Sequence, residues 1–97
     1  MSALKNSLDP VQILCLDGDG IGPEITAATR RVLQAVDDCF DLNLTFTSED
    51  IGFVSLAASG TTFPDKVLDA AKAADGIVLG PVSTIDYPPA SEGGINP

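Results

Sequence analysis

Between residues 13 and 25 the chain reads ILCLDGDGIGPEI. Four apolar residues lead into a bend of glycine and aspartate, and Pro23-Glu24 follows directly. Proline suits the first turn of a helix, because its fixed φ is helical and its missing N–H is not needed there. The stretch therefore predicts a strand, a tight turn and a helix start. Ligands of open α/β sheets bind at the carboxyl ends of strands, so the bend is a candidate binding site.

The elements on either side of the bend follow from hydrophobic patterning. Residues 11–16 are nearly all apolar, which predicts a strand buried on both faces, as in a parallel sheet. Residues 23–40 carry apolar side chains at close to 3.6-residue spacing, which predicts an amphipathic helix with one face on the sheet. The side chains expected on that face are Ala28, Val32, Leu33, Val36 and Phe40.

The rest of the chain alternates between strand and helix patterns. We predict a strand over 43–48, a short helix over 53–58, a helix over 64–73 and a strand over 76–80. In the longer of these helices Val67, Leu68 and Ala71 are expected to face inward. Strands alternating with helices at this spacing predict an α/β fold, a parallel-stranded open sheet with flanking helices.

The composition of the two ends differs from that of the α/β core expected over 11–80. Residues 1–10 form a polar arm. Residues 81–97 contain four prolines and two glycines, which excludes regular structure there. This last stretch is either a disordered tail or a loop that serves a site at the end of a strand.

Charge and the residue inventory exclude several function classes. The chain has 97 residues, a net charge of −9 and no histidine. We expect no nucleic-acid or membrane partner, because so acidic a surface repels phosphates. Zinc, haem and Ser-His catalysis within the chain are excluded as well. Without a signal or a membrane span the protein is expected to be cytoplasmic, with Cys15 and Cys39 as buried free thiols.

Two chemistries can be assigned to the bend itself. The DGDG sequence at 17–20, after an apolar strand, resembles the opening motif of haloacid-dehalogenase-type phosphatases. That resemblance implies Asp17 as nucleophile and Asp19 as acid/base around Mg²⁺. Ile21 and the immediate helix start at Pro23 depart from the motif. The plainer interpretation is that the aspartates are turn and helix-end charges and the glycines only shape a tight turn.

A longer pattern carries a second resemblance. The block GDGIGPEI at 18–25 resembles the N-terminal signature of the β-decarboxylating dehydrogenases, the isopropylmalate and isocitrate dehydrogenase family. Gly60 with Phe63-Pro64, the segment AADGIVLGPV at 73–82 and the segment EGGI at 92–95 match further blocks of that family. Four blocks in the same order are far more specific than any one of them.

The resemblance implies an enzyme that oxidises a malate-type 2-hydroxy acid, such as 3-isopropylmalate or isocitrate, and then decarboxylates the product. Its cofactors would be NAD or NADP and Mg²⁺ or Mn²⁺, and the full-length enzyme is expected to be a homodimer. The catalytic residues and metal ligands would lie outside this chain, which alone is expected to be inactive. The cofactor-binding residues carried over are Ile21, Val82, Ser83, Thr84 and Glu92, with Asn96 beside the substrate.

A third interpretation is an α/β binding module without catalysis. Tyr87, the one tyrosine, is expected to be a packing residue. The dehydrogenase interpretation depends on one spatial expectation. The glycine bend and the proline-rich segment must be neighbours, so that Ile21 and Ser83 lie at the same end of the fold.

Overall fold

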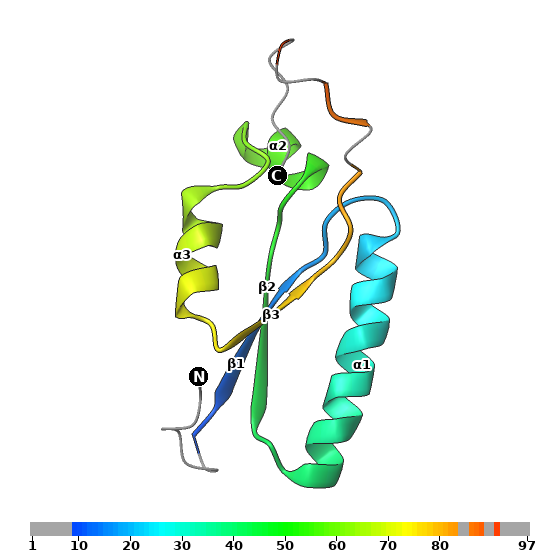
Figure 1. Ribbon diagram of the computed structural model, residues 1–97, viewed down its shortest axis with the longest axis vertical. Helices are drawn as coiled ribbons and strands as arrows, with labels where there is room; N and C mark the ends of the chain where they lie inside the picture. The colour runs from blue at the N-terminus through cyan, green and yellow to red at the C-terminus, as the bar shows by residue number, and fades with distance from the viewer. Residues whose placement is uncertain (1–8, 84–85, 89–90, 92–97) are drawn as a thin grey trace.

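A computed structural model describes residues 9–83, 86–88 and 91 (Figure 1). Each element begins and ends within one residue of the range expected from the sequence. The chain order is β1 (Val11–Leu16), α1 (Gly22–Phe40), β2 (Leu44–Glu49), α2 (Phe53–Ser59), α3 (Asp65–Ala73) and β3 (Gly76–Leu79).

The three strands form one parallel sheet with β1 in the centre, in the order β2-β1-β3. In the register of this sheet Leu14 pairs with Thr47 on one side and with Ile77 on the other. The first connection, through α1, leads from β1 to its neighbour β2, and the second, through α2 and α3, crosses from β2 past β1 to β3. The helices α1 and α3 lie on opposite sides of the sheet (Figure 1). The predicted α/β class, a parallel open sheet with flanking helices, is confirmed.

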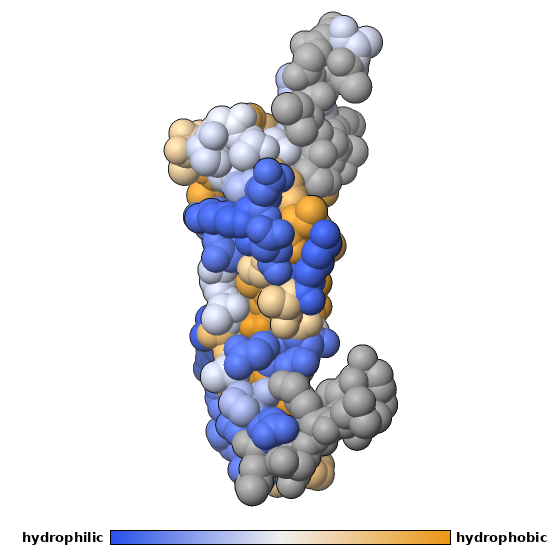
Figure 2. Space-filling model, turned by 90° about the vertical axis from the view of Figure 1, so that its left-hand side faces the viewer, coloured by the Kyte–Doolittle hydropathy of each residue, from blue (hydrophilic) through white to orange (hydrophobic). Residues whose placement is uncertain are grey.

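The hydrophobic core joins β1 to α3. Leu14 and Leu16 point to the same face of β1, because side chains alternate along a strand, and they cluster with Ile51 and Val67. Val67 is fully buried, as expected, but Leu68 is 44% exposed, so its inward assignment was wrong. Seen from the α3 side, hydrophobic side chains lie between hydrophilic ones on this surface (Figure 2).

The apolar stripe of α1 does not face the sheet, contrary to expectation. Val32 is 64% exposed and Phe40 is 72% exposed, and Val36 and Ala28 are exposed too. Of the expected set only Leu33 is half-buried. Despite this apolar outer face, the described residues include no helix that is long and apolar enough to cross a membrane.

Polar side chains occupy the inner face of α1 instead. Thr26 is buried, and the Arg30 guanidinium lies 4.9 Å from the centre of the Phe46 ring on β2. The Asp37 carboxylate accepts the N–H of Leu44 at 3.2 Å, which ties the end of the helix to the start of β2. These anchors orient α1, and the stripe centred on Val32 and Phe40 therefore points away from the sheet.

The two thiols differ in exposure. Cys15 is buried in β1, as expected, whereas Cys39 near the end of α1 is exposed. Cys39 belongs to the exposed outer side of α1. The prediction of two buried thiols was therefore wrong for Cys39.

Candidate functional site

The bend after β1 lies against the segment that follows β3. The Asp19 N–H donates to the Pro81 carbonyl at 2.8 Å. Gly18 has φ +79°, and a Cβ there would lie 2.1 Å from the same Pro81 oxygen. A side chain at this position would meet both a strained backbone and a fixed neighbour. The bend is therefore a packed junction between two loops as well as a turn.

Two other glycines are required by close approach alone. A Cβ on Gly22, at the start of α1, would lie 1.9 Å from the Asp17 carbonyl oxygen. A Cβ on Gly80, just after β3, would lie at the same distance from the same oxygen. The Asp17 carbonyl is thus held between two glycines from different elements. Turn geometry alone does not account for the glycine pattern.

The structure brings the predicted cofactor residues Ile21, Val82 and Ser83 to this junction. The Ser83 hydroxyl oxygen lies 3.8 Å from where a Cβ on Gly20 would be. Ile21, next along the bend, is 59% exposed, while Val82 and Ser83 are half-buried. The bend and the segment after β3 are neighbours, as expected from the sequence. The other predicted site residues, Thr84, Glu92 and Asn96, lie outside the described residues.

Asp19 is the polar centre of the junction. Its side chain is only 5% exposed. Oδ1 accepts the Phe53 N–H at 2.8 Å, and Oδ2 accepts the Ser83 N–H at 3.0 Å together with the Tyr87 hydroxyl. A Cβ on Gly52 would lie 2.2 Å from Oδ1, so only glycine fits before α2. One carboxylate therefore joins the bend, the start of α2 and the segment after β3.

Tyr87 completes this cluster from the apolar side. It is 7% exposed, and its ring stacks on Phe53 with centroids 4.2 Å apart and planes 3° from parallel. The packing role expected for Tyr87 is correct but incomplete, because its hydroxyl also donates to Asp19. The interpretation of Asp19 as a turn charge missed its burial. No sequence spacing links positions 19, 53, 83 and 87, so periodicity could not have found the cluster.

The cluster shifts the acidity of both polar groups. Burial on its own would raise the pKa of Asp19, but the hydrogen bonds from Tyr87, Phe53 and Ser83 outweigh it and lower the pKa below 3.8. Burial raises the pKa of the Tyr87 hydroxyl, and the hydrogen bond and charge of Asp19 add to the effect, bringing it to about 12. Asp19 is accordingly ionised and Tyr87 neutral across the physiological range.

This arrangement does not support the phosphatase interpretation. That chemistry needs the carboxylates of Asp17 and Asp19 to converge on Mg²⁺. The Asp19 carboxylate is instead buried and occupied by three protein donors. Within the described part of the chain, no group of three or more His, Cys, Asp or Glu residues could hold a metal ion.

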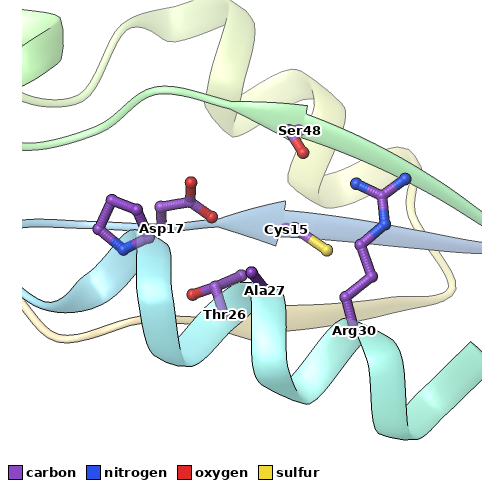
Figure 3. A pocket seen from close by; sticks show the side chains of 7 residues that line it. Cys15, Asp17, Thr26, Ala27, Arg30 and Ser48 are labelled. Atoms are coloured by element: carbon purple, nitrogen blue, oxygen red, sulfur yellow. The ribbon is translucent and has the colours of Figure 1, made fainter.

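A hollow of about 120 Å³ lies between α1 and the strands β1 and β2 (Figure 3). Burial raises the pKa of the Cys15 thiol on its floor, and the nearby Arg30 partly offsets this. The buried Thr26 hydroxyl has no hydrogen-bond partner among the described residues. The hollow has room for a few water molecules, whereas ligand pockets measure about 300–1,000 Å³. Its size does not suit a dinucleotide.

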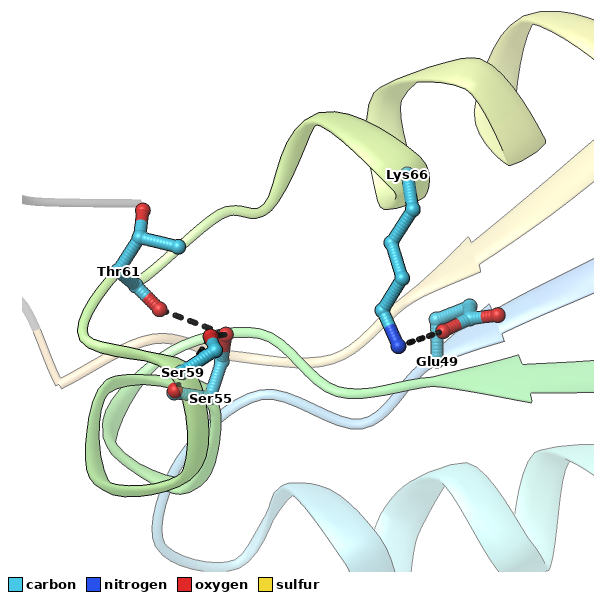
Figure 4. A network of polar contacts seen from close by, with 5 residues as sticks. All are labelled: Glu49, Ser55, Ser59, Thr61 and Lys66. Carbon is cyan, nitrogen blue, oxygen red and sulfur yellow. Dashed lines mark hydrogen bonds and ion pairs between the residues drawn. The ribbon is translucent and has the colours of Figure 1, made fainter.

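A second polar network fixes α2 and the turn that follows it (Figure 4). The Ser55 hydroxyl donates to the Thr61 carbonyl at 2.6 Å, and the Ser59 hydroxyl donates to the Ser55 carbonyl at 2.9 Å. Lys66 of α3 pairs with Glu49 of β2 at 3.5 Å, but its side chain is 74% exposed, so we expect the pair to contribute little. The serine bonds hold the helix whose first residue is Phe53.

Comparison with known proteins supplies the family. Residues 12–97 match the isocitrate/isopropylmalate dehydrogenase family. The 3-isopropylmalate dehydrogenase of Hahella chejuensis (strain KCTC 2396) is 49% identical over 71 residues, which are 73% of this chain and 20% of that protein. The 3-isopropylmalate dehydrogenase of Shouchella clausii (strain KSM-K16) is 45% identical over 71 residues, with the same coverage of both chains.

The fold has a solved counterpart. The crystal structure of isocitrate dehydrogenase from Methylococcus capsulatus matches with a TM-score of 0.66 and 29% identity, covering 75% of this chain and 20% of that chain. The chain therefore spans about a fifth of the length of these relatives. Since the match covers residues 12–97, with the glycine junction inside it, the chain belongs to the isocitrate/isopropylmalate dehydrogenase family.

Proposed function

We propose that the chain is the N-terminal part of an NAD- or NADP-dependent oxidoreductase. The whole enzyme would oxidise and decarboxylate a malate-type 2-hydroxy acid with the help of Mg²⁺ or Mn²⁺. The observation that carries this proposal, beside the family membership, is the contact between the glycine bend and the segment after β3. Because the curated relatives are 3-isopropylmalate dehydrogenases, 3-isopropylmalate is the first substrate to test.

The described residues fit one wall of a nicotinamide site. Ile21 presents an exposed aliphatic side chain, on which a flat ring can pack. The bare Cα of Gly20 leaves space beside the Ser83 hydroxyl, 3.8 Å from where a Cβ would be. Val82 would contribute a second apolar contact. When bound, the nicotinamide supplies a hydride acceptor and the divalent cation a Lewis acid.

The remaining assignments come from the family resemblance. Thr84 and Glu92 would bind the nicotinamide nucleotide, with Glu92 reaching its ribose, and Asn96 would stand beside the substrate. We assign the catalytic residues and the metal ligands to the other four fifths of the enzyme. Homodimer formation and a cytoplasmic location belong to the same proposal, and the net charge of −9 favours no nucleic-acid partner.

A chimera tests the function. Residues 12–97 of this chain, the stretch that matches the family, would replace their counterpart in the Hahella chejuensis enzyme. We expect the chimera to reduce NAD with 3-isopropylmalate and Mg²⁺. The 97-residue chain alone should neither oxidise nor decarboxylate the substrate. An active isolated chain, or a folded chimera without activity, would contradict the proposal.

A matched pair of variants tests the cofactor wall. Ile21 and Val32 are exposed aliphatic residues, 59% and 64% accessible; Ile21 lies in the bend just before α1, and Val32 lies in the middle of α1, away from the bend. In the chimera, Ile21→Ser should raise the KM for NAD about tenfold, because an apolar contact worth roughly 1.4 kcal/mol is lost. Val32→Ser should leave that KM unchanged. Equal effects of the two substitutions would remove Ile21 from the site.

A further inference from the structure

Asp19 holds together three segments that are far apart in the sequence. Its own bend follows β1, Phe53 opens α2, and Ser83 and Tyr87 follow β3. The family resemblance assigns Asp19 no contact with cofactor or substrate, and its 5% exposure keeps it from touching either. One of the hydrogen bonds that it accepts nevertheless comes from Ser83, which the proposed function places in the nicotinamide wall.

We propose that Asp19 is a positioning residue, whose hydrogen bonds with Ser83, Phe53 and Tyr87 fix the segment after β3 against the glycine bend. These bonds thereby set the distance between the bend and Ser83, which together form the proposed nicotinamide wall. This inference rests on the proposed function. Asp19 acts through Ser83, not on the reacting atoms.

The geometry makes aspartate specific at this position. Both carboxylate oxygens accept backbone N–H groups, and Oδ2 accepts the Tyr87 hydroxyl as well. Asparagine has a single acceptor oxygen, so one of the two N–H groups would face its NH₂ group. Glutamate is one methylene longer, and Oδ1 already lies so close to Gly52 that a Cβ there would be 2.2 Å away, so a longer side chain would collide with this backbone.

The effect on the site passes through a short path. The Ser83 N–H is 3.0 Å from Oδ2, and the Ser83 hydroxyl lies 3.8 Å from the Cβ position of Gly20. Gly20 directly precedes Ile21. If the hydrogen bond from the Ser83 N–H to the Asp19 carboxylate is lost, the glycine bend and the segment after β3 are no longer held together at this point. We therefore expect weaker cofactor binding with less change in substrate binding.

The contact itself can be measured in the 97-residue chain. Tyr87 is the only tyrosine and there is no tryptophan, so the tyrosinate absorbance reports this residue alone. At pH 10.5 an ordinary tyrosine is about three quarters ionised, whereas one with a pKa of about 12 is only a few per cent ionised. We expect the second value, because Tyr87 is buried and faces the charges of Asp19 and Asp86.

Variants complete this measurement. Asp19→Asn should raise the ionised fraction of Tyr87 several-fold at pH 10.5. Asp17→Asn, which removes the same charge two residues earlier, should change it little. A wild-type chain with native circular dichroism and a three-quarters ionised tyrosine would overturn the proposal without any variant.

Kinetics of the chimera test the link to the cofactor. Asp19→Asn should raise the KM for NAD about tenfold and the KM for 3-isopropylmalate less than twofold, while Asp17→Asn changes neither. Should the Asp19 variant fail to fold, Tyr87→Phe, which keeps the ring stack on Phe53, should raise the KM for NAD about threefold. Equal changes in both KM values, or an unchanged KM for NAD, would overturn the positioning role. An inactive wild-type chimera would instead contradict the proposed function.

Discussion

At the carboxyl end of the sheet the Asp19 carboxylate is 5% exposed and accepts three hydrogen bonds, whereas on the outer face of α1 Val32 is 64% and Phe40 72% exposed. A charged group is buried in one region and large apolar groups face solvent in the other. Burial of a charge is stable only where hydrogen bonds compensate for lost water. Large exposed apolar patches mark surfaces that interact with another part of a protein, a partner or a ligand.

The difference teaches which part of the chain is complete by itself. The junction around Asp19 satisfies its polar groups from within the described residues. The apolar stripe on the outer face of α1 is not covered by the described residues. The chain spans only about a fifth of the length of its relatives. We propose that the rest of the enzyme covers this face. The two regions should therefore respond differently to the same kind of perturbation.

The largest effect is expected from a methyl group placed inside the junction. In Gly80→Ala the new Cβ would lie 1.9 Å from the Asp17 carbonyl oxygen, and a backbone carbonyl cannot move aside cheaply. We expect a loss of about 3 kcal/mol or more in the free energy of unfolding, measured by urea denaturation. For so small a domain this loss is enough to prevent folding.

Gly76→Ala is the matched control, at the start of β3. There the new Cβ would meet the Ile13 Cδ1 at 3.2 Å, the far end of a flexible side chain. We expect a change of less than about 1 kcal/mol, since that side chain can shift. If both variants lost equal stability, the junction would be no more tightly packed than the rest of the sheet.

A smaller loss is expected at high pH. The fold raises the pKa of Tyr87 to about 12 from 10.0, so it favours the protonated hydroxyl. This contribution is complete below pH 10 and is lost as the pH rises through about 12. It amounts to the order of 2 kcal/mol. Between pH 9 and pH 11.5 the free energy of unfolding, measured with urea, should therefore fall more for the wild-type chain than for Tyr87→Phe. That variant has nothing to titrate at this position. Equal losses would show that Tyr87 is not buried beside a charge.

On the outer face of α1 the expected change in stability is smaller still. The double variant Val32→Ser and Phe40→Ser should alter the free energy of unfolding by less than about 0.5 kcal/mol per site, because both side chains are already exposed. It should, however, reduce self-association in sedimentation velocity, since apolar contact area is lost. Arg31→Ser, an exposed change on the same helix, is the control. A wild-type chain that stays monomeric at high concentration would contradict this view of the face.

The elements could be predicted from the sequence because local patterns determine them. Apolar runs, 3.6-residue spacing and the glycine bend placed every strand and helix to within a residue. The family blocks also indicated that the bend meets the segment after β3. The orientation of α1 could not be read in this way. The spacing of its apolar residues identifies a stripe along the helix. However, the cation–π contact of Arg30 with Phe46 and the hydrogen bond from the Leu44 N–H to Asp37 turn another face to the sheet.

The centre of the candidate site was also beyond the sequence. An aspartate in a glycine turn usually stays at the surface, and nothing in the pattern distinguishes Asp19 from Asp17. The difference arises only in three dimensions, where Phe53, Ser83 and Tyr87 arrive from separate elements with donors for the same carboxylate. Such a cluster depends on long-range contacts, which local periodicity does not encode.

The smallest effect compares the inner and outer sides of α1. Cys15 is 1% exposed beneath α1, and burial raises the pKa of its thiol, so it is both inaccessible and poorly ionised. Cys39 lies on the exposed side of the same helix. Because the thiolate is the reacting species, a disulfide reagent at pH 8 should modify Cys39 at least a hundredfold faster than Cys15, with no change in stability. In 6 M urea the two rates should converge. Equal rates in the native chain would mean that α1 separates readily from the sheet, and that the contacts of Arg30 with Phe46 and of Asp37 with Leu44 hold it only weakly.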